Sequence, residues 1–300
     1  MAESRREIAK ALVVNVLIAV AKGVGAAISG SGAMLAETLH SFADCGNQVL
    51  LFVGIRSSHK PPDPRHPLGY GRAMYFYSFI VALLLFFGGG VFSIREGIAK
   101  LAHPERVEDV GIAIGVLAVS LVLDGYSTWS NVREIGRRRG DKSLWRYLRD
   151  TKDSDLILVF GENVAGVIGI VTAFVSVLVA HATGDGRWDA IGSLAIGLVL
   201  VAVATFLARE VKSLLVGEAA DPAVCAHVAA VAEADADVER VLNVITMQQG
   251  PGEILVAAKL EYRAGLSTAE IVAAINRFER DLKARAPEVR WSFIEPDDEA

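Results

Sequence analysis

Long apolar runs constrain this chain more than any other feature. A bilayer core about 30 Å thick needs roughly 20 apolar residues per helix, and about six runs of the sequence meet that requirement. They lie near residues 7–29, 33–56, 74–100, 109–130, 156–181 and 188–215. Hydrophobic residues make up 52% of the chain and charged residues 22%, a composition too apolar for an ordinary soluble domain. We therefore predict an α-helical membrane protein with six transmembrane helices.

The character of the sequence changes near residue 216. Residues 216–300 carry eight Lys and Arg residues against sixteen Asp and Glu residues, whereas the preceding part is slightly basic. Residue patterns in this acidic part predict the order helix, strand, strand, helix, strand, and Ser267 with Glu270 forms a capping box before the second helix. We expect a transmembrane domain at 1–215 and a cytoplasmic α+β domain (αββαβ) at 216–300.

Basic residues gather in two of the predicted loops. One loop follows the second apolar run, and the other lies between residues 133 and 152 and holds eight Lys and Arg residues. Cytoplasmic loops are enriched in Lys and Arg, so we predict that both termini are cytoplasmic. We expect the inner membrane of a bacterium. The basic residues belong to loops and form no patch on a folded domain, so we expect no nucleic-acid partner.

The second apolar run carries a polar face. Glu37, His40, Asp44 and Asn47 fall within an arc of about 80° when each residue advances by about 100°. An ionisable group in the hydrocarbon zone costs at least ~2.5 kcal/mol on insertion scales, so such groups usually face the interior of a bundle and serve a function. His40 and Asp44, spaced i and i+4, offer the imidazole and carboxylate that bind divalent metals such as Zn²⁺.

Some of these polar residues have a simpler interpretation. Polar side chains in membranes also hold helices together by hydrogen bonds, and this explanation fits Asn47 well. Glu37 either lines a cation pathway or meets water near the outer end of its helix. Asp124, in the fourth run, is either part of a proton path or one half of an interhelical hydrogen bond.

A metal site needs ligands from a second helix. Early in the fifth run, GENVAG (residues 161–166) puts Glu162 and Asn163 into an otherwise apolar stretch. We expect Glu162 to complete a site with His40 and Asp44, and Asn163 or water to supply the fourth ligand. The alternative is that Glu162 lies at the membrane boundary and is solvated.

With these residues in view, the sequence resembles the cation diffusion facilitators, a family of six-helix transporters of divalent cations. The resemblance is carried by MLAETLHSFADCGNQ (34–48), by DPRHPLGYGRAMYFYSF (63–79), and by the stretch that runs from DAIGSLAIG to GEAADP (189–222). FGENVAG and HPLGYGR are most similar to the branch of the ninth mammalian zinc transporter. In the family pattern, His40 and Asp44 stand at the two ligand positions of the second helix.

The resemblance implies a homodimer that exports Zn²⁺ or a related ion in exchange for protons, by alternating access around this site. It also implies a ferredoxin-like cytoplasmic domain that contributes to dimerisation, no resident cofactor and no enzymatic activity. Protonation of the ligands and metal binding compete, which gives proton coupling a physical basis. Two alternatives stay open: a Mn²⁺ or Fe²⁺ exporter of the same fold, and a non-transporting membrane scaffold or metal sensor.

The sequence departs from the family pattern at some metal positions. Asn163 stands where most members have Asp, and Val159 stands at the partner position four residues earlier. The resulting set is richer in oxygen ligands, which shifts preference toward Mn²⁺ or Fe²⁺. In the loop after the second run, Asp63 and His66 match two of the three residues of a second metal site, while the third is Tyr70. The alternative is that His66 is a structural loop residue.

The acidic domain lacks the metal ligands of many relatives. Asn243, Ala258 and Ile294–Glu295 occupy the corresponding positions, and His227 is the only histidine in residues 216–300. The resemblance therefore implies a domain that has lost a regulatory metal cluster and works mainly as a dimer clamp.

Overall fold

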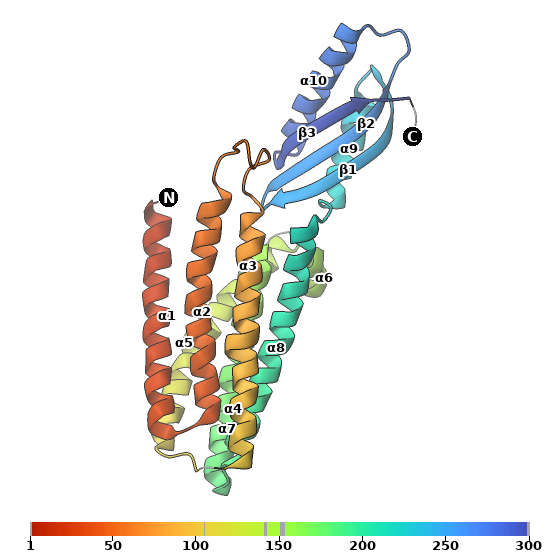
Figure 1. The fold of residues 1–300 in the computed structure, drawn as a ribbon. Coiled ribbons are helices and arrows are strands. Elements are labelled where there is room, and N and C mark those ends of the chain that lie inside the picture. The colour runs from red at the N-terminus through yellow and green to blue at the C-terminus, as the bar shows by residue number, and fades with distance from the viewer. Residues whose placement is uncertain (1, 105, 141–142, 151–153, 299–300) are drawn as a thin grey trace. The chain divides into compact units, whose positions relative to one another are not determined.

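The computed structural model describes residues 2–104, 106–140, 143–150 and 154–298. Long helices make up the chain as far as residue 216, and a small domain of helices and strands follows (Figure 1). The helices of the first part are α1 (Ala2–Ser29), α2 (Gly32–Ser58), α3 (Ala73–Leu84), the π-helical segment η1 (Leu85–Val91), α4 (Phe92–Ala102), α5 (Val110–Arg138), α6 (Leu144–Asp150), α7 (Ser154–Thr183) and α8 (Arg187–Val216).

The chain divides into two compact units. The first comprises Met1–Val53, Tyr77–Arg149 and Asp155–Val211, and the second comprises Gly54–Phe76, Asp150–Ser154 and Lys212–Ala300. The loop between α2 and α3 therefore belongs to the same unit as the C-terminal strands. Within that unit Gly71 lies against the backbone of strand β1 (Val238–Gly250), because a Cβ atom on Gly71 would lie 2.6 Å from the Gln249 carbonyl oxygen.

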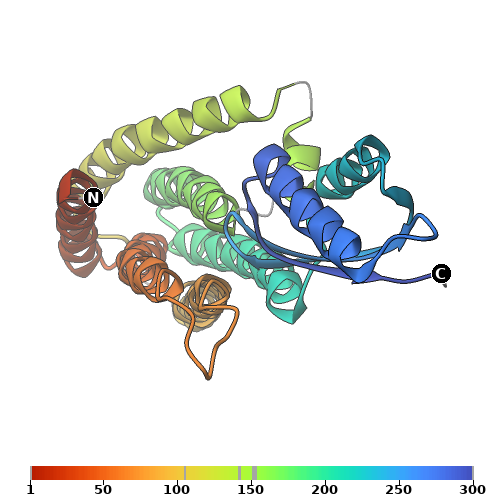
Figure 2. The same cartoon turned by 90° about the horizontal axis from the view of Figure 1, so that it is seen from above.

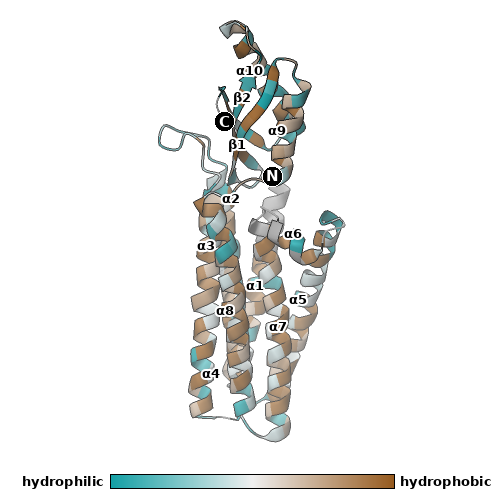
Figure 3. Ribbon diagram, turned by 90° about the vertical axis from the view of Figure 1, so that its right-hand side faces the viewer, coloured by the Kyte–Doolittle hydropathy of each residue, from teal (hydrophilic) through white to brown (hydrophobic). Residues whose placement is uncertain are grey.

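Four helical stretches are long and apolar enough to cross a membrane, judged over the described residues. They are Ala73–Ala102, Val110–Arg138, Val159–Thr183 and Arg187–Val216, and the colour of hydrophobic residues dominates the long helices in Figure 3. The helix α2 has a similar length, but four polar residues interrupt it, and the apolar part of α1 is the shorter stretch Asn15–Ser29. The arrangement with six membrane spans stays a prediction.

The rod formed by α3, η1 and α4 packs closely on α8. A Cβ atom on Gly90 would lie 2.6 Å from the Val201 side chain, and one on Gly97 would lie 2.6 Å from the Leu194 side chain. Such small residues let helix backbones approach in a bilayer, where van der Waals packing drives helix association. Glycine is therefore required at these two positions by the neighbouring helix.

A carboxylate from another helix fixes the start of α2. Asp189, in the first turn of α8, accepts hydrogen bonds from Ser31 Oγ (2.5 Å) and from the amides of Gly32 (2.5 Å) and Ala33 (3.3 Å). The first amides of a helix have no partner within it, and the helix dipole favours a negative charge there. The Lys100 ammonium lies 3.9 Å from the same carboxylate. Asp189 thus holds the N-terminus of α2 against α8.

The C-terminal unit follows the predicted order of elements. They are α9 (Pro222–Ala234), β1 (Val238–Gly250), β2 (Glu253–Tyr262), α10 (Thr268–Arg285) and β3 (Val289–Pro296). The strands form one sheet in the order β1-β2-β3, with β1 antiparallel and β3 parallel to β2. Residues of β2 alternate strictly, so that Ile254, Val256, Ala258 and Leu260 are buried in a core shared with the helices. The capping box of Ser267 and Glu270 forms as predicted.

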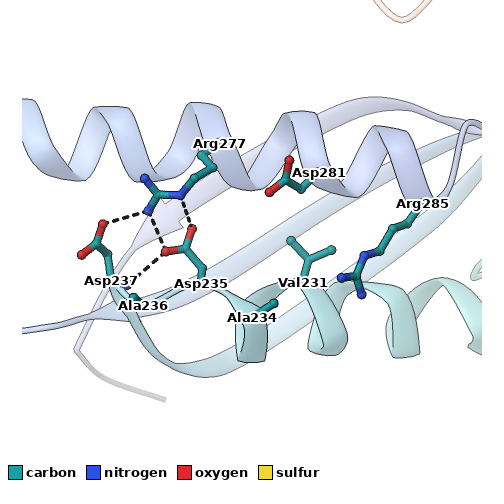
Figure 4. Close-up of a pocket in the computed structure, with 8 residues that line it drawn as sticks. All are labelled: Val231, Ala234, Asp235, Ala236, Asp237, Arg277, Asp281 and Arg285. Carbon is teal, nitrogen blue, oxygen red and sulfur yellow. Dashed lines mark hydrogen bonds and ion pairs between the residues drawn. The ribbon is translucent and has the colours of Figure 1, made fainter.

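An ion-pair network holds α10 to the turn between α9 and β1 (Figure 4). Arg277 donates to both carboxylate oxygens of Asp235 (2.9 and 2.6 Å) and to Asp237 (2.8 Å). Burial acts to raise the pKa of Asp235, but the hydrogen bonds from Arg277 and from the Asp237 amide outweigh it and leave that pKa below its usual value. The same contacts raise the pKa of Arg277.

Candidate functional site

The polar face of α2 turns inward, as its spacing predicts. Glu37, His40 and Asn47 are buried, and the Asp44 side chain is 28% exposed. The alternative in which Glu37 meets water at the end of the helix is wrong, because its side chain is 0% exposed. Three turns of α2 therefore present polar atoms to the inside of the helical unit.

Two glycines of α7 receive this face. A Cβ atom on Gly166 would lie 3.2 Å from His40 Nε2, and one on Gly169 would overlap Glu37 Oε1. Gly166 and Gly169 are three residues apart, so they lie on the same side of their helix. No sequence pattern predicted a role for these two glycines, although GENVAG ends at the first of them. Their missing side chains create the space in which His40 and Glu37 lie.

His40 and Asp44 form the central pair of the site. Nδ1 of His40 lies 3.5 Å from Oδ1 of Asp44, across one turn of α2. That oxygen and both ring nitrogens of His40 are buried and have no hydrogen-bond partner in the described structure. Buried polar atoms are nearly always paired, so three unpaired atoms on adjacent turns indicate a site for a ligand or proton. An imidazole nitrogen beside a carboxylate oxygen suits a divalent transition metal.

Glu162 contacts α2 one turn further along. Its Oε1 accepts a hydrogen bond from Nδ2 of Asn47 (2.5 Å), which joins α7 to α2. The interpretation of Asn47 as a link between helices fits this contact, and a Glu162 that is merely solvated does not. Asn47 lies three residues beyond Asp44 on the same helix, so Glu162 meets α2 within one turn of that acid.

The expected metal ligands do not meet at one point. Among the described residues, no three His, Cys, Asp or Glu side chains are grouped closely enough to hold a metal ion. Glu162 is engaged by Asn47, and Asn163 meets α5 through its backbone carbonyl, which accepts from Thr128 Oγ1 (3.2 Å). Neighbouring residues on a helix point about 100° apart, so Glu162 and Asn163 cannot both face α2.

A lysine that sequence reasoning missed lies beside the pair. Lys22 of α1 is 1% exposed, and its ammonium lies 3.1 Å from Glu37 Oε2, 2.9 Å from Ser41 Oγ and 3.4 Å from Asp124 Oδ2. Figure 2 shows α1 between α2 and α5, the helices that carry these partners. Of the two alternatives for Asp124, the structure shows a contact between helices. The feature of the sequence that could have indicated this role is the charge of Lys22 within the first apolar run.

Asp63 and His66 make their contacts within the loop between α2 and α3 and stabilise its conformation. Asp63 Oδ1 accepts from the amides of Arg65 and His66 (2.8 Å each), and Oδ2 accepts from the Tyr70 hydroxyl (2.6 Å). The Tyr70 hydrogen bond, followed by the amide of His66, lowers the pKa of Asp63 to about 2. The His66 ring lies 4.1 Å from the Tyr70 ring. With both oxygens engaged, Asp63 has a structural task here, and the alternative of a structural His66 fits this geometry.

The tail positions singled out earlier come together on the sheet. Asn243, Ala258, Ile294 and Glu295 line a pocket of about 260 Å³ with Ile245, Ala257, Lys259 and Phe293. The Lys259 ammonium contacts Asp297 (2.5 Å) and Glu295 (4.0 Å). Lys259 thus already contacts Glu295, the acid that lines this pocket, and the other lining residues are mostly apolar. These residues are a poor set of ligands for a metal.

Comparison with protein families gives one assignment. A family model described as the cation efflux transmembrane domain matches residues 8–216, which is more than half of the chain. The matched region contains the polar face of α2, the glycines of α7 and Lys22.

Three curated relatives resemble the chain over most of its length. Proteins named as mitochondrial proton-coupled zinc antiporters are 28% identical over 306 residues in Xenopus laevis and 27% identical over 306 residues in Homo sapiens. These matches cover 89% of this chain and 55% and 54% of the relatives. A metal tolerance protein of Arabidopsis thaliana is 28% identical over 261 residues, or 86% of this chain and 57% of that protein. The chain thus spans about half the length of the curated relatives it matches.

Proposed function

This chain belongs to the cation efflux family, and on that premise we propose that it exports a divalent metal cation, Zn²⁺ before Mn²⁺ or Fe²⁺, from the cytoplasm in exchange for protons. Family membership indicates a transporter and not an enzyme, and the four apolar spans make it an integral membrane protein. The relatives named as proton-coupled zinc antiporters support both the metal and the proton.

The observation that carries the proposal is the His40–Asp44 pair. Its buried nitrogen and oxygen atoms lack partners, and they lie on the inner face of α2 against Gly166. An unpaired imidazole in a bilayer protein is expensive to keep unless a ligand occupies it for part of the cycle. The imidazole favours Zn²⁺ over the harder ions.

Glu162 completes the site by changing partners. In the structure its carboxylate accepts a hydrogen bond from Asn47, which lies three residues beyond Asp44 on the same helix. We propose that an arriving metal draws Glu162 from Asn47 to His40 and Asp44, with water completing the coordination. His40, Asp44 and Glu162 must be deprotonated to bind metal, so protons arriving from one side of the membrane expel it. This exchange of partners would couple metal binding to the contact between α2 and α7, and we propose that it contributes to alternating access.

The membrane arrangement is part of the proposal. Six spans, with both termini in the cytoplasm of a bacterium, follow from the apolar runs and the basic loops; the relatives named as mitochondrial suggest an organelle membrane instead. Cys225 is exposed on α9 and Cys45 is buried on α2. A membrane-impermeant maleimide is therefore expected to label Cys225 in inside-out vesicles and to leave sealed right-side-out vesicles unlabelled. Labelling of right-side-out vesicles would reverse the orientation.

We also propose that the C-terminal unit, as a ferredoxin-like domain, joins two chains through the open face of its sheet. Ile245 and Phe293 are more than half exposed on that face (55% and 56%), beside the pocket of Asn243 and Ala257. Ile245→Glu is expected to convert a dimer to a monomer in light scattering of the detergent-solubilised protein. Val272→Glu is the matched control, because Val272 is similarly exposed (51%) on α10. A dimer that survives Ile245→Glu and Phe293→Glu together contradicts this interface.

Transport itself is tested by flux into proteoliposomes with a pH gradient. Zinc, manganese and iron are compared in the wild type and in Asp44→Ala, which leaves the polar contacts of Lys22 and Glu162 in place. We expect gradient-driven flux of zinc, absent in Asp44→Ala. The alternative of a scaffold or sensor is supported by the lack of three grouped ligands among the described residues. It predicts that well-folded protein transports none of the three metals.

A further inference from the structure

Lys22 is a buried charged group of the membrane unit that the proposed transport site does not use. It lies on α1, and its three partners lie on α2 and α5. An ammonium has three N–H groups, and Glu37, Ser41 and Asp124 supply one acceptor to each. The three N–H groups of Lys22 thus match three acceptors on two other helices. The acceptors together form a cation site, and the Lys22 ammonium fills it.

The acceptors are ones that a divalent cation also prefers. Two carboxylates and a hydroxyl give only oxygen ligands, which suit hard ions such as Mn²⁺ or Mg²⁺. The second oxygen of Glu37 is buried, has no hydrogen-bond partner and lies against Gly169. Glu37 therefore has a second carboxylate oxygen, not hydrogen-bonded to Lys22, that could also bind a cation.

The Lys22 site adjoins the His40–Asp44 pair. Glu37 precedes His40 by three residues and Ser41 follows it directly, so one turn of α2 serves both sites. Without the ammonium, the carboxylates of Glu37 and Asp124 would be open to a metal next to His40.

We propose that the Lys22 ammonium is a tethered cation that fills a second cation site formed by Glu37, Asp124 and Ser41. It thereby restricts the membrane unit to one exchangeable metal, at His40 and Asp44. Lys22 is a specificity-determining residue in this scheme and not a ligand of the transported ion. The inference rests on the proposed transport function, and it concerns the number of metals bound, not whether one is carried.

The test counts bound Mn²⁺ by electron paramagnetic resonance in the detergent-solubilised full chain, after one equivalent of Zn²⁺ per chain has been added to fill the His40–Asp44 site. Lys22→Met removes the charge and keeps an unbranched apolar stem. We expect it to bind one more Mn²⁺ per chain than the wild type. Lys22→Arg keeps a cation and is expected to match the wild type. The triple variant Lys22→Met, Glu37→Gln, Asp124→Asn removes the carboxylates and is expected to lose the additional ion.

Each outcome decides the inference. Equal Mn²⁺ in wild type and in folded Lys22→Met overturns it and leaves Lys22 as a link between helices. Additional Mn²⁺ that persists in the triple variant also overturns it, because the ion then binds elsewhere. If Lys22→Met does not fold, Lys22→Gln replaces it, since its amide can still donate to Glu37, and the same additional ion is expected.

Failure of the proposed function gives a different pattern. Zinc binding that is the same in wild type and Asp44→Ala removes the His40–Asp44 site, whatever Lys22→Met shows. Zinc binding that depends on Asp44, with no additional Mn²⁺ in Lys22→Met, removes only the second site.

Discussion

The carboxylate of Glu37 on α2 lies directly against the backbone of Gly169 on α7, with no space between them for even a methyl group. One turn away, His40 Nε2 faces Gly166, and a Cβ atom added to Gly166 would lie 3.2 Å from that nitrogen. The separation of α2 and α7 is thus set by glycine at two positions, next to the atoms proposed to bind metal.

Gly169→Ala is expected to force these helices apart. Overpacking at a tight site typically costs about 1–3 kcal/mol, and moving α7 also carries Glu162 away from His40. We expect zinc affinity to fall at least about tenfold in calorimetry. Gly115→Ala is the matched control, because Gly115 lies on α5 with nothing within 4 Å of its added Cβ. Equal affinity in the two variants would mean that this contact does not define the site.

Asn47 and Glu162 offer a test of the exchange of partners. A hydrogen bond to a charged group contributes about 1.5–3 kcal/mol, and metal binding must break this one. Asn47→Ala is therefore expected to raise zinc affinity about tenfold, whereas Glu162→Gln lowers it by a similar factor. A lower affinity in Asn47→Ala would instead make Asn47 a ligand.

The loop supplies a comparison for those two variants. Both oxygens of Asp63 are occupied by the loop's own hydrogen bonds. Asp63→Ala is expected to leave zinc affinity and flux within about twofold of the wild type, while hydrogen exchange in residues 63–70 becomes faster. A large loss of affinity in Asp63→Ala, with none in Glu162→Gln, would move the metal site into the loop.

Asp189 is expected to stabilise the membrane unit through the start of α2. Loss of a capping group costs about 0.5–2 kcal/mol, and this one serves two amides and a hydroxyl. Asp189→Ala should lower the thermal midpoint in detergent, and Asp189→Asn, which keeps an acceptor oxygen, should lower it less. Identical midpoints in the wild type and Asp189→Ala would show that the cap contributes nothing measurable.

The Arg277–Asp235 pair predicts a pH dependence in the C-terminal unit. The folded-state pKa of Asp235 lies below its usual value, so its contribution to stability is present above the unfolded pKa of about 3.9 and is lost as pH falls through the folded pKa. Hydrogen exchange of the full chain, corrected for intrinsic rates, should show protection at β1 that is constant from pH 7 to about 5 and falls below about 4.

Arg277→Met provides the control for this pH dependence. The variant should be less protected at pH 7, by about 1 kcal/mol in opening free energy for this partly exposed pair. The difference from the wild type should shrink as Asp235 becomes protonated. A difference that is the same at pH 7 and pH 3 would assign the effect to packing of the Arg277 stem.

Several features of this protein could be predicted from the sequence, because they depend on local periodicity. The polar face of α2 was visible because Glu37, His40, Asp44 and Asn47 recur at helical spacing. The order of elements in the C-terminal unit and the Ser267–Glu270 capping box followed from alternation and from a local hydrogen-bond pattern. These signals need only neighbours in the chain, so no knowledge of the packing was required.

Only the tertiary structure decided which distant atoms meet. In the structure Glu162 contacts Asn47 and not the His40–Asp44 pair. Lys22 of α1 contacts Glu37, and Asp189 of α8 accepts hydrogen bonds at the start of α2. These contacts depend on how helices are rotated and how closely they approach, which glycines such as Gly169 set by the side chains they lack. Sequence periodicity gives the direction of a side chain around its own helix. The partner it meets is set by the packing of the other helices, which no single run of residues contains.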